Sequence, residues 1–101
     1  MNRAIMKTHF NKDFLEDSTE TLRAIAHPIR IAIIDLLHHN VEMTVTDIYK
    51  KLNIEQAIAS HHLRILKNKN VVNVTRDGKN SLYSLSDQDF YEIIKTLTKV
   101  I

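Results

Sequence analysis

The stretch that decides the fold is residues 45–85, VTDIYKKLNIEQAIASHHLRILKNKNVVNVTRDGKNSLYSL. Its first part predicts two helices, Asp47–Leu52 and Glu55 to about Lys69, joined by a very short turn. Thr46 is expected to cap the first helix, because a threonine hydroxyl accepts a hydrogen bond from the free N–H groups there. Asn53 is expected to end that helix in the left-handed conformation, which asparagine tolerates best after glycine. This arrangement predicts a helix-turn-helix unit.

The second part of the stretch predicts a β-hairpin directly after the second helix. Two β-prone runs, Val71–Thr75 and Ser81–Leu85, flank a loop at 76–80 that holds Gly78, the only glycine of the chain. Asp-Gly between such runs is a strong hairpin signal. A hairpin in this place is a wing, and a winged helix-turn-helix presents its second helix to the DNA major groove.

Outside this stretch the sequence predicts three more helices. The first runs from Asn11 to Ala26, and the next begins at Pro28 and ends near His38-His39-Asn40. Residues 41–45 are expected to form an isolated extended piece. A last helix, capped by Ser86 or Asp87, is expected to run to the end of the chain with an apolar stripe.

Length and composition indicate one mainly α-helical domain over residues 1–101, with the first nine residues as a flexible arm. The chain is 44% hydrophobic and has one glycine and one proline, too few for the many turns of an all-β sandwich. It has no cysteine, which excludes disulfides and thiolate chemistry. No apolar run approaches the length of a membrane span, and the N-terminus lacks the pattern of a secretory signal, so a cytoplasmic location is expected.

Positive charge is concentrated in the decisive stretch. Residues 45–85 contain seven basic and three acidic side chains, a net charge of +4, whereas residues 1–44 and 86–101 each sum to −1. A basic patch favours an anionic partner such as nucleic acid. A solvated face without a ligand is the alternative.

The second helix of the pair has a surface suited to DNA bases. Ile58, Ala59, Leu63 and Leu66 are expected to point inward, and the outward positions are Gln56, Ala57, Ser60, His61 and Arg64. Glutamine can bind adenine through two hydrogen bonds, serine can bind bases or phosphate, and an alanine methyl can contact thymine. Glu55 would repel phosphate and is expected to cap the helix instead. Phosphates would be neutralised by Lys50, Lys51, Arg64, Lys67, Arg76 and Lys79.

Three segments resemble the ArsR/SmtB type of transcriptional regulator. They are LRAIAHPIRI at 22–31, SHHLRIL at 60–66, and RDGK at 76–79 followed by YSL at 83–85. They keep the family's order and spacing over about residues 15–87. The resemblance implies a homodimeric winged-helix repressor with its first and last helices in the dimer interface. It also implies that the outward residues named above face DNA, that Arg76 and Lys79 approach phosphates, and that His62 divides its role between packing and a backbone contact.

The apolar stripes of the two terminal helices, 10–26 and 87–101, also favour dimerisation. These stripes contain Phe14, Leu22, Ile25, Phe90, Ile94 and Leu97 and exceed what a small core needs to cover. Packing within one chain is the alternative.

The sequence departs from the metal-sensing members of the family it resembles. Thr44 and Thr46 stand where one family site has two cysteines, and threonine is a poor ligand for soft metals. In the last helix Asp87 and Asp89 lack the later histidines of a second site. No metal and no cofactor are therefore expected, although a zinc site built from His9, His27 or His38 across a dimer is an alternative.

These observations predict a homodimeric, sequence-specific DNA-binding transcriptional regulator, most simply a repressor, with a small-molecule effector left unidentified. The alternative is a winged-helix protein-interaction module that does not bind nucleic acid. An enzyme is not expected, because no catalytic triad, glycine-rich phosphate loop or metal triad is found in the sequence.

Overall fold

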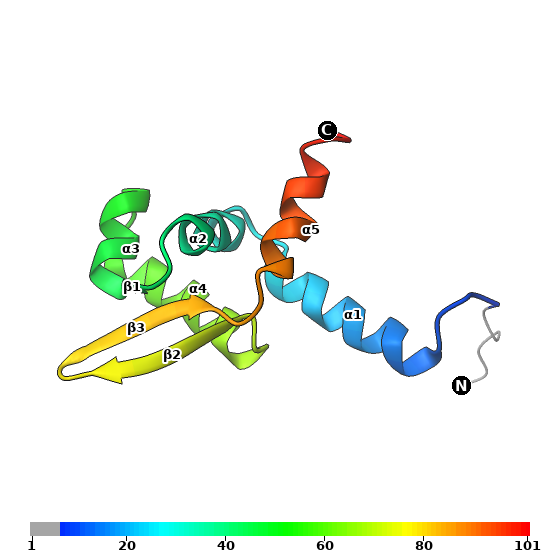
Figure 1. Cartoon of the computed structure of the whole chain (residues 1–101), viewed down its shortest axis with the longest axis horizontal. Helices are drawn as coiled ribbons and strands as arrows, with labels where there is room; N and C mark the ends of the chain where they lie inside the picture. The colour runs from blue at the N-terminus through cyan, green and yellow to red at the C-terminus, as the bar shows by residue number, and fades with distance from the viewer. Residues whose placement is uncertain (1–6) are drawn as a thin grey trace.

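The computed structural model describes residues 7–101, which form five helices and a three-stranded antiparallel sheet (Figure 1). The elements are α1 (Lys12–Ile25), α2 (Pro28–His39), β1 (Met43–Thr44), α3 (Val45–Leu52), α4 (Gln56–Asn68), β2 (Val72–Asp77), β3 (Asn80–Leu85) and α5 (Asp89–Leu97). The predicted order of helices and hairpin is confirmed. No helix in the described part is long and apolar enough to span a membrane. The proposed arm falls largely on residues 1–6, which lie outside the described residues.

Local capping chemistry sets the start of the first two helices. The Asn11 side chain accepts a hydrogen bond from the Phe14 amide at 2.8 Å, as a capping residue should. Pro28 is the first residue of α2, where its missing N–H costs nothing. The cap of α2 is His27, whose Nδ1 accepts from the Ile29 amide at 3.0 Å. The sequence reasoning did not foresee this histidine cap.

The start of α3 differs from the prediction. Thr44, not Thr46, caps the helix, and its hydroxyl accepts from the Asp47 amide at 3.1 Å. The segment before α3 is not isolated either, since β1 pairs with β3 through Met43↔Tyr83 and Thr44↔Leu82. The reason is burial: Met43 belongs to the core, and pairing satisfies the backbone of the strand that places it there.

The turn between α3 and α4 forms as predicted. Asn53 adopts φ 56° and ψ 48°, the left-handed conformation. The Asn53 and Ile54 amides donate to the Lys50 and Tyr49 carbonyls at 3.2 and 3.1 Å, which closes the end of α3. Glu55 occupies the N-cap position of α4 as expected, but its side chain makes no capping hydrogen bond.

The hairpin is longer and its turn is tighter than predicted. β2 and β3 pair from Val72↔Leu85 to Asp77↔Asn80, which leaves only Gly78 and Lys79 in the turn. Gly78 has φ +63°, a backbone conformation that residues with a side chain rarely adopt. This explains why the single glycine of the chain is at this position. The strand order β1-β3-β2 makes β3 the central strand.

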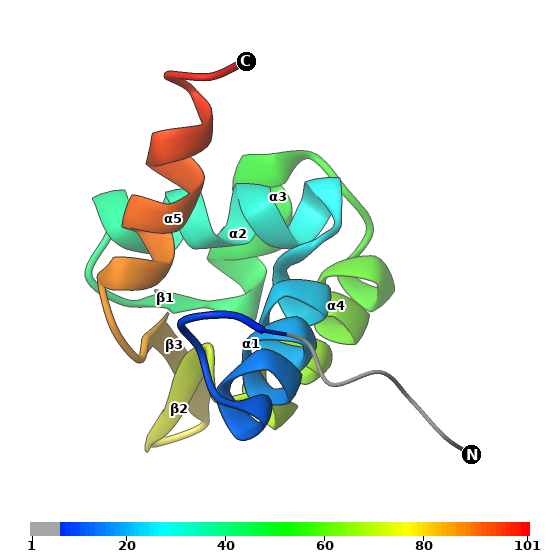
Figure 2. The ribbon, with the colours of Figure 1, turned by 90° about the vertical axis from the view of Figure 1, so that its right-hand side faces the viewer.

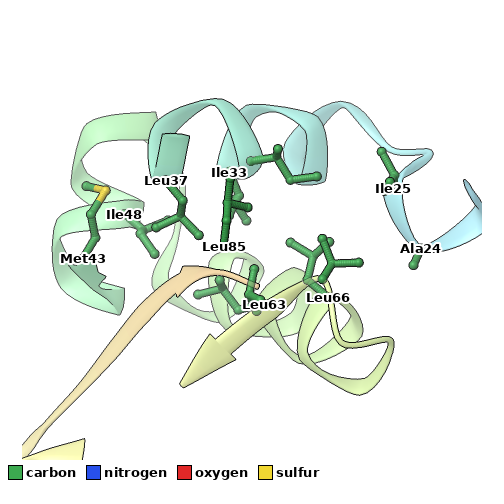
Figure 3. Packing of buried hydrophobic residues seen from close by; sticks show 12 residues of the cluster. Ala24, Ile25, Ile33, Leu37, Met43, Ile48, Leu63, Leu66 and Leu85 are labelled. Atoms are coloured by element: carbon green, nitrogen blue, oxygen red, sulfur yellow. The ribbon is translucent and has the colours of Figure 1, made fainter. Parts of the chain in front are cut away.

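The core lies between α2, α3, α4 and the base of the hairpin (Figure 3). Its fully buried large side chains are Ile33, Ile34, Leu37, Ile48, Leu63, Leu66 and Val71. Ala59, Leu63 and Leu66 point inward from α4 as predicted, but Ile58 does not and is 39% exposed. Ile58 lies about 100° around the helix from Ala59, which is enough to place it at the edge of the buried face.

The helices α1 and α5 extend away from this core on the side opposite the tip of the hairpin (Figures 1 and 2). α5 ends at Leu97, before the predicted end at Ile101. The Asp87 carboxylate accepts from the Asp89 amide at 2.8 Å, while the Ser86 hydroxyl instead donates to the Asn70 and Val71 carbonyls. Asp87 therefore stabilises the start of α5, and Ser86 binds the residues that directly follow α4.

Candidate nucleic-acid interface

The outer face of α4 presents the residues expected to contact bases. Gln56, Ala57, His61 and Arg64 are exposed, and Ser60 is half-buried. The opposite face of the helix is fixed by Ala59, Leu63 and Leu66 in the core. The core therefore holds α4 so that short and polar side chains face outward, which suits a helix that enters a groove.

Exposed cations surround this face. Lys50 and Lys51 lie in the last turn of α3, Arg64 and Lys67 on α4, and Arg76 and Lys79 at the end of the hairpin. Within residues 7–101, neither the three lysine or arginine ion pairs nor the contact of His39 with Asp35 uses any of these six cations. Arg76 donates only to the neutral Ser81 hydroxyl, at 3.1 Å. Their charge is therefore available to an anionic partner.

Lys69 differs from these cations although it follows the last turn of α4. Its ammonium group lies 3.4 Å from the Glu20 carboxylate of α1. Glu20 also pairs with Arg23 on its own helix, at 3.4 Å. Lys69 thus connects α4 to α1 and contributes little free positive charge.

His62 lies on the inner side of α4 and is buried. Its ring contacts the ring of His27 at a tilt of 35° with centroids 4.2 Å apart, and its Nδ1 lies 3.1 Å from Nη1 of Arg30. Burial, and then the nearby His27, Arg30 and His61, lower the pKa of His62. The expected packing role fits these contacts, but its polar partner is the Arg30 side chain, which no local pattern in the sequence indicated.

The residues predicted for dimerisation fall into two groups. Phe14, Leu22 and Leu97 are exposed, whereas Phe90 and Ile94 are half-buried against the core and Ile25 belongs to the core itself. Four further apolar side chains are exposed near the ends of the described chain, which are Phe10, Ile93, Val100 and Ile101. Phe10 stacks on Phe14 with ring centroids 4.8 Å apart, so it extends the apolar surface of α1.

The histidines considered for zinc have other partners or lie apart in the protomer. His27 contacts His62, and His38 stacks on Tyr91 and hydrogen-bonds Gln88. Within the described 95 residues no three His, Asp or Glu side chains come together to hold a metal ion. A site shared between two copies stays a prediction.

A tight helix pair whose second helix is exposed, followed by a hairpin, is a winged helix-turn-helix fold. The predicted fold class is therefore confirmed, with β1 as a third strand. A family model described as "Bacterial regulatory protein, arsR family" matches residues 27–74.

Two relatives show the family to which the chain belongs. The transcriptional repressor PagR of Bacillus anthracis is 34% identical over 86 residues, which are 85% of this chain and 86% of PagR. The HTH-type transcriptional repressor SmtB of Mycobacterium tuberculosis is 36% identical over 83 residues, 82% of this chain, but the match spans only 61% of SmtB. This chain belongs to the ArsR family of bacterial regulatory proteins, as its resemblance indicated. The relatives are regulators, in agreement with the expectation that the protein is not an enzyme.

Solved structures agree with this assignment. The crystal structure of PagR superposes with a TM-score of 0.77 at 33% identity and covers 86% of this chain and 99% of PagR. NolR from Sinorhizobium fredii superposes with a TM-score of 0.79 at 29% identity and covers 94% of this chain and 96% of NolR.

Proposed function

We propose that this protein is a homodimeric, sequence-specific DNA-binding repressor of transcription. The observation that most supports the proposal is the outer face of α4, where base-binding side chains are exposed between cations that have no carboxylate partner among residues 7–101. In this proposal α4 enters the major groove, and Arg76 and Lys79 of the hairpin approach the phosphate backbone. The names of PagR and SmtB as transcriptional repressors support the repressor role.

Dimerisation is supported by the surface of the protomer. The helices α1 and α5 extend from the body (Figures 1 and 2), and they expose the apolar side chains of Phe14, Leu22 and Leu97. Two copies joined through α1 and α5 would cover this apolar surface and place two α4 helices about 34 Å apart, one turn of DNA.

The test is a comparison of specific and non-specific binding. A duplex enriched by this protein from a random library and a scrambled duplex of equal length are titrated in gel shifts. The double variant Ser60→Ala/Arg64→Ala should weaken binding to the enriched duplex by about tenfold or more, with much less change on the scrambled one. Equal losses on both duplexes would contradict the assignment of these residues to base recognition.

A second variant isolates the phosphate contacts. Lys79→Ala should weaken binding to both duplexes alike and lower the slope of log affinity against log salt by about 2, since a dimer has two copies. Lys99→Ala removes the same charge beyond α5, far from the hairpin, and should leave the slope unchanged. If no duplex is enriched and none binds at low salt, the protein-interaction alternative replaces this proposal.

A further inference from the structure

Arg30 of α2 joins three helices without an acidic partner. Its Nη1 lies 3.1 Å from His62 Nδ1 on α4, and its Nη2 donates to the Arg23 carbonyl of α1 at 3.3 Å. Its Nε is buried and has no hydrogen-bond partner in the described chain. None of the ion pairs among residues 7–101 includes Arg30. The guanidinium group is therefore held by neutral acceptors only.

The chemistry of the Arg30–His62 contact fixes the state of the histidine. An arginine donates and never accepts, because its guanidinium group stays protonated. His62 Nδ1 must therefore accept, so the ring is neutral and its proton lies on Nε2. A protonated ring would turn an N–H toward another donor and place two cations about 3 Å apart.

The surroundings of His62 offer nothing that would stabilise its charged form. The groups that act on its charge are His27 at the α1–α2 junction, Arg30 on α2 and His61 on α4. Among the described residues, no hydrogen bond or ion pair joins His62 to a carboxylate. All three groups, together with burial, oppose protonation.

We propose that Arg30 is a positioning residue for DNA binding, which fixes the orientation of α4 on α1 and α2 through its hydrogen bond to neutral His62. Protonation of His62 breaks this contact and weakens DNA binding. The inference rests on the proposed function. His61 directly precedes His62 on the helix, and Ser60 and Arg64 each lie two residues away from it, so a displacement of His62 moves the side chains assigned to base contacts.

The sign of the effect follows from the lowered pKa of His62. The folded state binds this proton less readily than the unfolded chain, whose histidine pKa is about 6.5. The Arg30–His62 contact therefore makes its full contribution to the stability of the folded state above that pH. This contribution is lost as the pH falls from there through the folded-state pKa of His62.

The test compares adjacent histidines. Asparagine places an amide oxygen close to the position of histidine Nδ1, so His62→Asn keeps an acceptor for Arg30 but does not titrate. Affinity for the enriched duplex is measured at about pH 8 and about pH 5, and each protein is compared with itself. Relative to His62→Asn, the wild type should lose at least about threefold more affinity on acidification.

The control is His61→Asn, which removes the exposed histidine beside His62. This variant keeps the Arg30–His62 contact, so it should lose at least as much affinity at low pH as the wild type does. Identical pH profiles for the wild type and His62→Asn would overturn the inference. A merely structural role of His62 would change affinity at both pH values alike.

A measurement without DNA keeps the inference separate from the proposed function. Nitrogen NMR of the wild-type protein should show His62 with its proton on Nε2 and a pKa below the usual histidine value of about 6.5. The Nδ1–H form, or a His62 that titrates above this value, would overturn the inference even if His62→Asn fails to fold. A failure of every duplex to bind, with the NMR result as expected, would reject DNA as the partner and leave the helix contact in place.

Discussion

The helices α4 and α5 are held in place in different ways. α4 has four buried residues, Ala59, His62, Leu63 and Leu66, whereas α5 has none. α5 is attached to α2 by a stack of Tyr91 on His38 with centroids 3.6 Å apart and by a 2.8 Å contact between His38 and Gln88. The protomer alone thus fixes the helix that would contact DNA, while the helix proposed for dimerisation keeps apolar surface for a second copy.

The largest expected effect comes from a substitution in the buried face of α4. Leu66→Ala removes a fully buried side chain and should lower the free energy of unfolding by about 2–5 kcal/mol. Ile58→Ala on the same helix, where the side chain is 39% exposed, should cost less than about 1 kcal/mol. Urea unfolding of both variants measures the difference, and equal losses would show that Ile58 is buried after all.

The next effect concerns the apolar surface of α1 and α5. Leu22→Glu combined with Leu97→Glu should convert the proposed dimer to a monomer in sedimentation, with its helical circular dichroism retained. Affinity for the enriched duplex should then fall by about 100-fold, because two linked binding sites become one. Val41→Glu is the matched control, since Val41 is 85% exposed in the loop before β1. A double variant that stays dimeric would exclude these helices as the interface.

A smaller effect tests the turn that sets the angle of α4. Asn53→Ala should lower the free energy of unfolding by about 1 kcal/mol, because alanine is strained at φ 56°. Asn53→Gly should be neutral or slightly stabilising by the same argument. Thermal or urea unfolding distinguishes the two, and an equal loss for both would show that the Asn53 side chain itself matters.

The smallest expected effect concerns the attachment of α5 to α2. Tyr91→Leu removes the stack on His38 and should cost about 0.5 kcal/mol, because leucine keeps part of the apolar contact. Amide hydrogen exchange should become faster in α5 and stay unchanged in α4, which does not depend on this contact. Glu92→Gln, an exposed neighbour, is the control and should alter neither helix.

Much of the fold could be predicted from residues whose conformational needs are local. Pro28 begins α2, Asn53 closes α3 and Gly78 turns the hairpin, as each residue's own backbone preferences require. The inward positions Ala59, Leu63 and Leu66 followed from helical spacing. The exposed residues of the candidate site followed from the same spacing.

The remaining features depend on contacts between distant residues. The pairing of β1 with β3 and the resulting cap at Thr44 need a strand 38 to 40 positions further along the chain, as in Met43↔Tyr83 and Thr44↔Leu82. Ile58 lies at the edge of a face whose width is set by the neighbouring helices, not by α4 itself. The Arg30–His62 contact joins residues 32 positions apart, and neither residue alone indicates it.

The short strand β1 has a consequence for how the protein could be regulated. Thr44 pairs with Leu82 of the hairpin and caps α3, so hairpin and helix pair are joined through one residue. This pairing restrains the base of the hairpin against the helix pair. In the proposed dimer, a signal that releases DNA would therefore move the hairpin and the helix pair together and change the angle between the two copies.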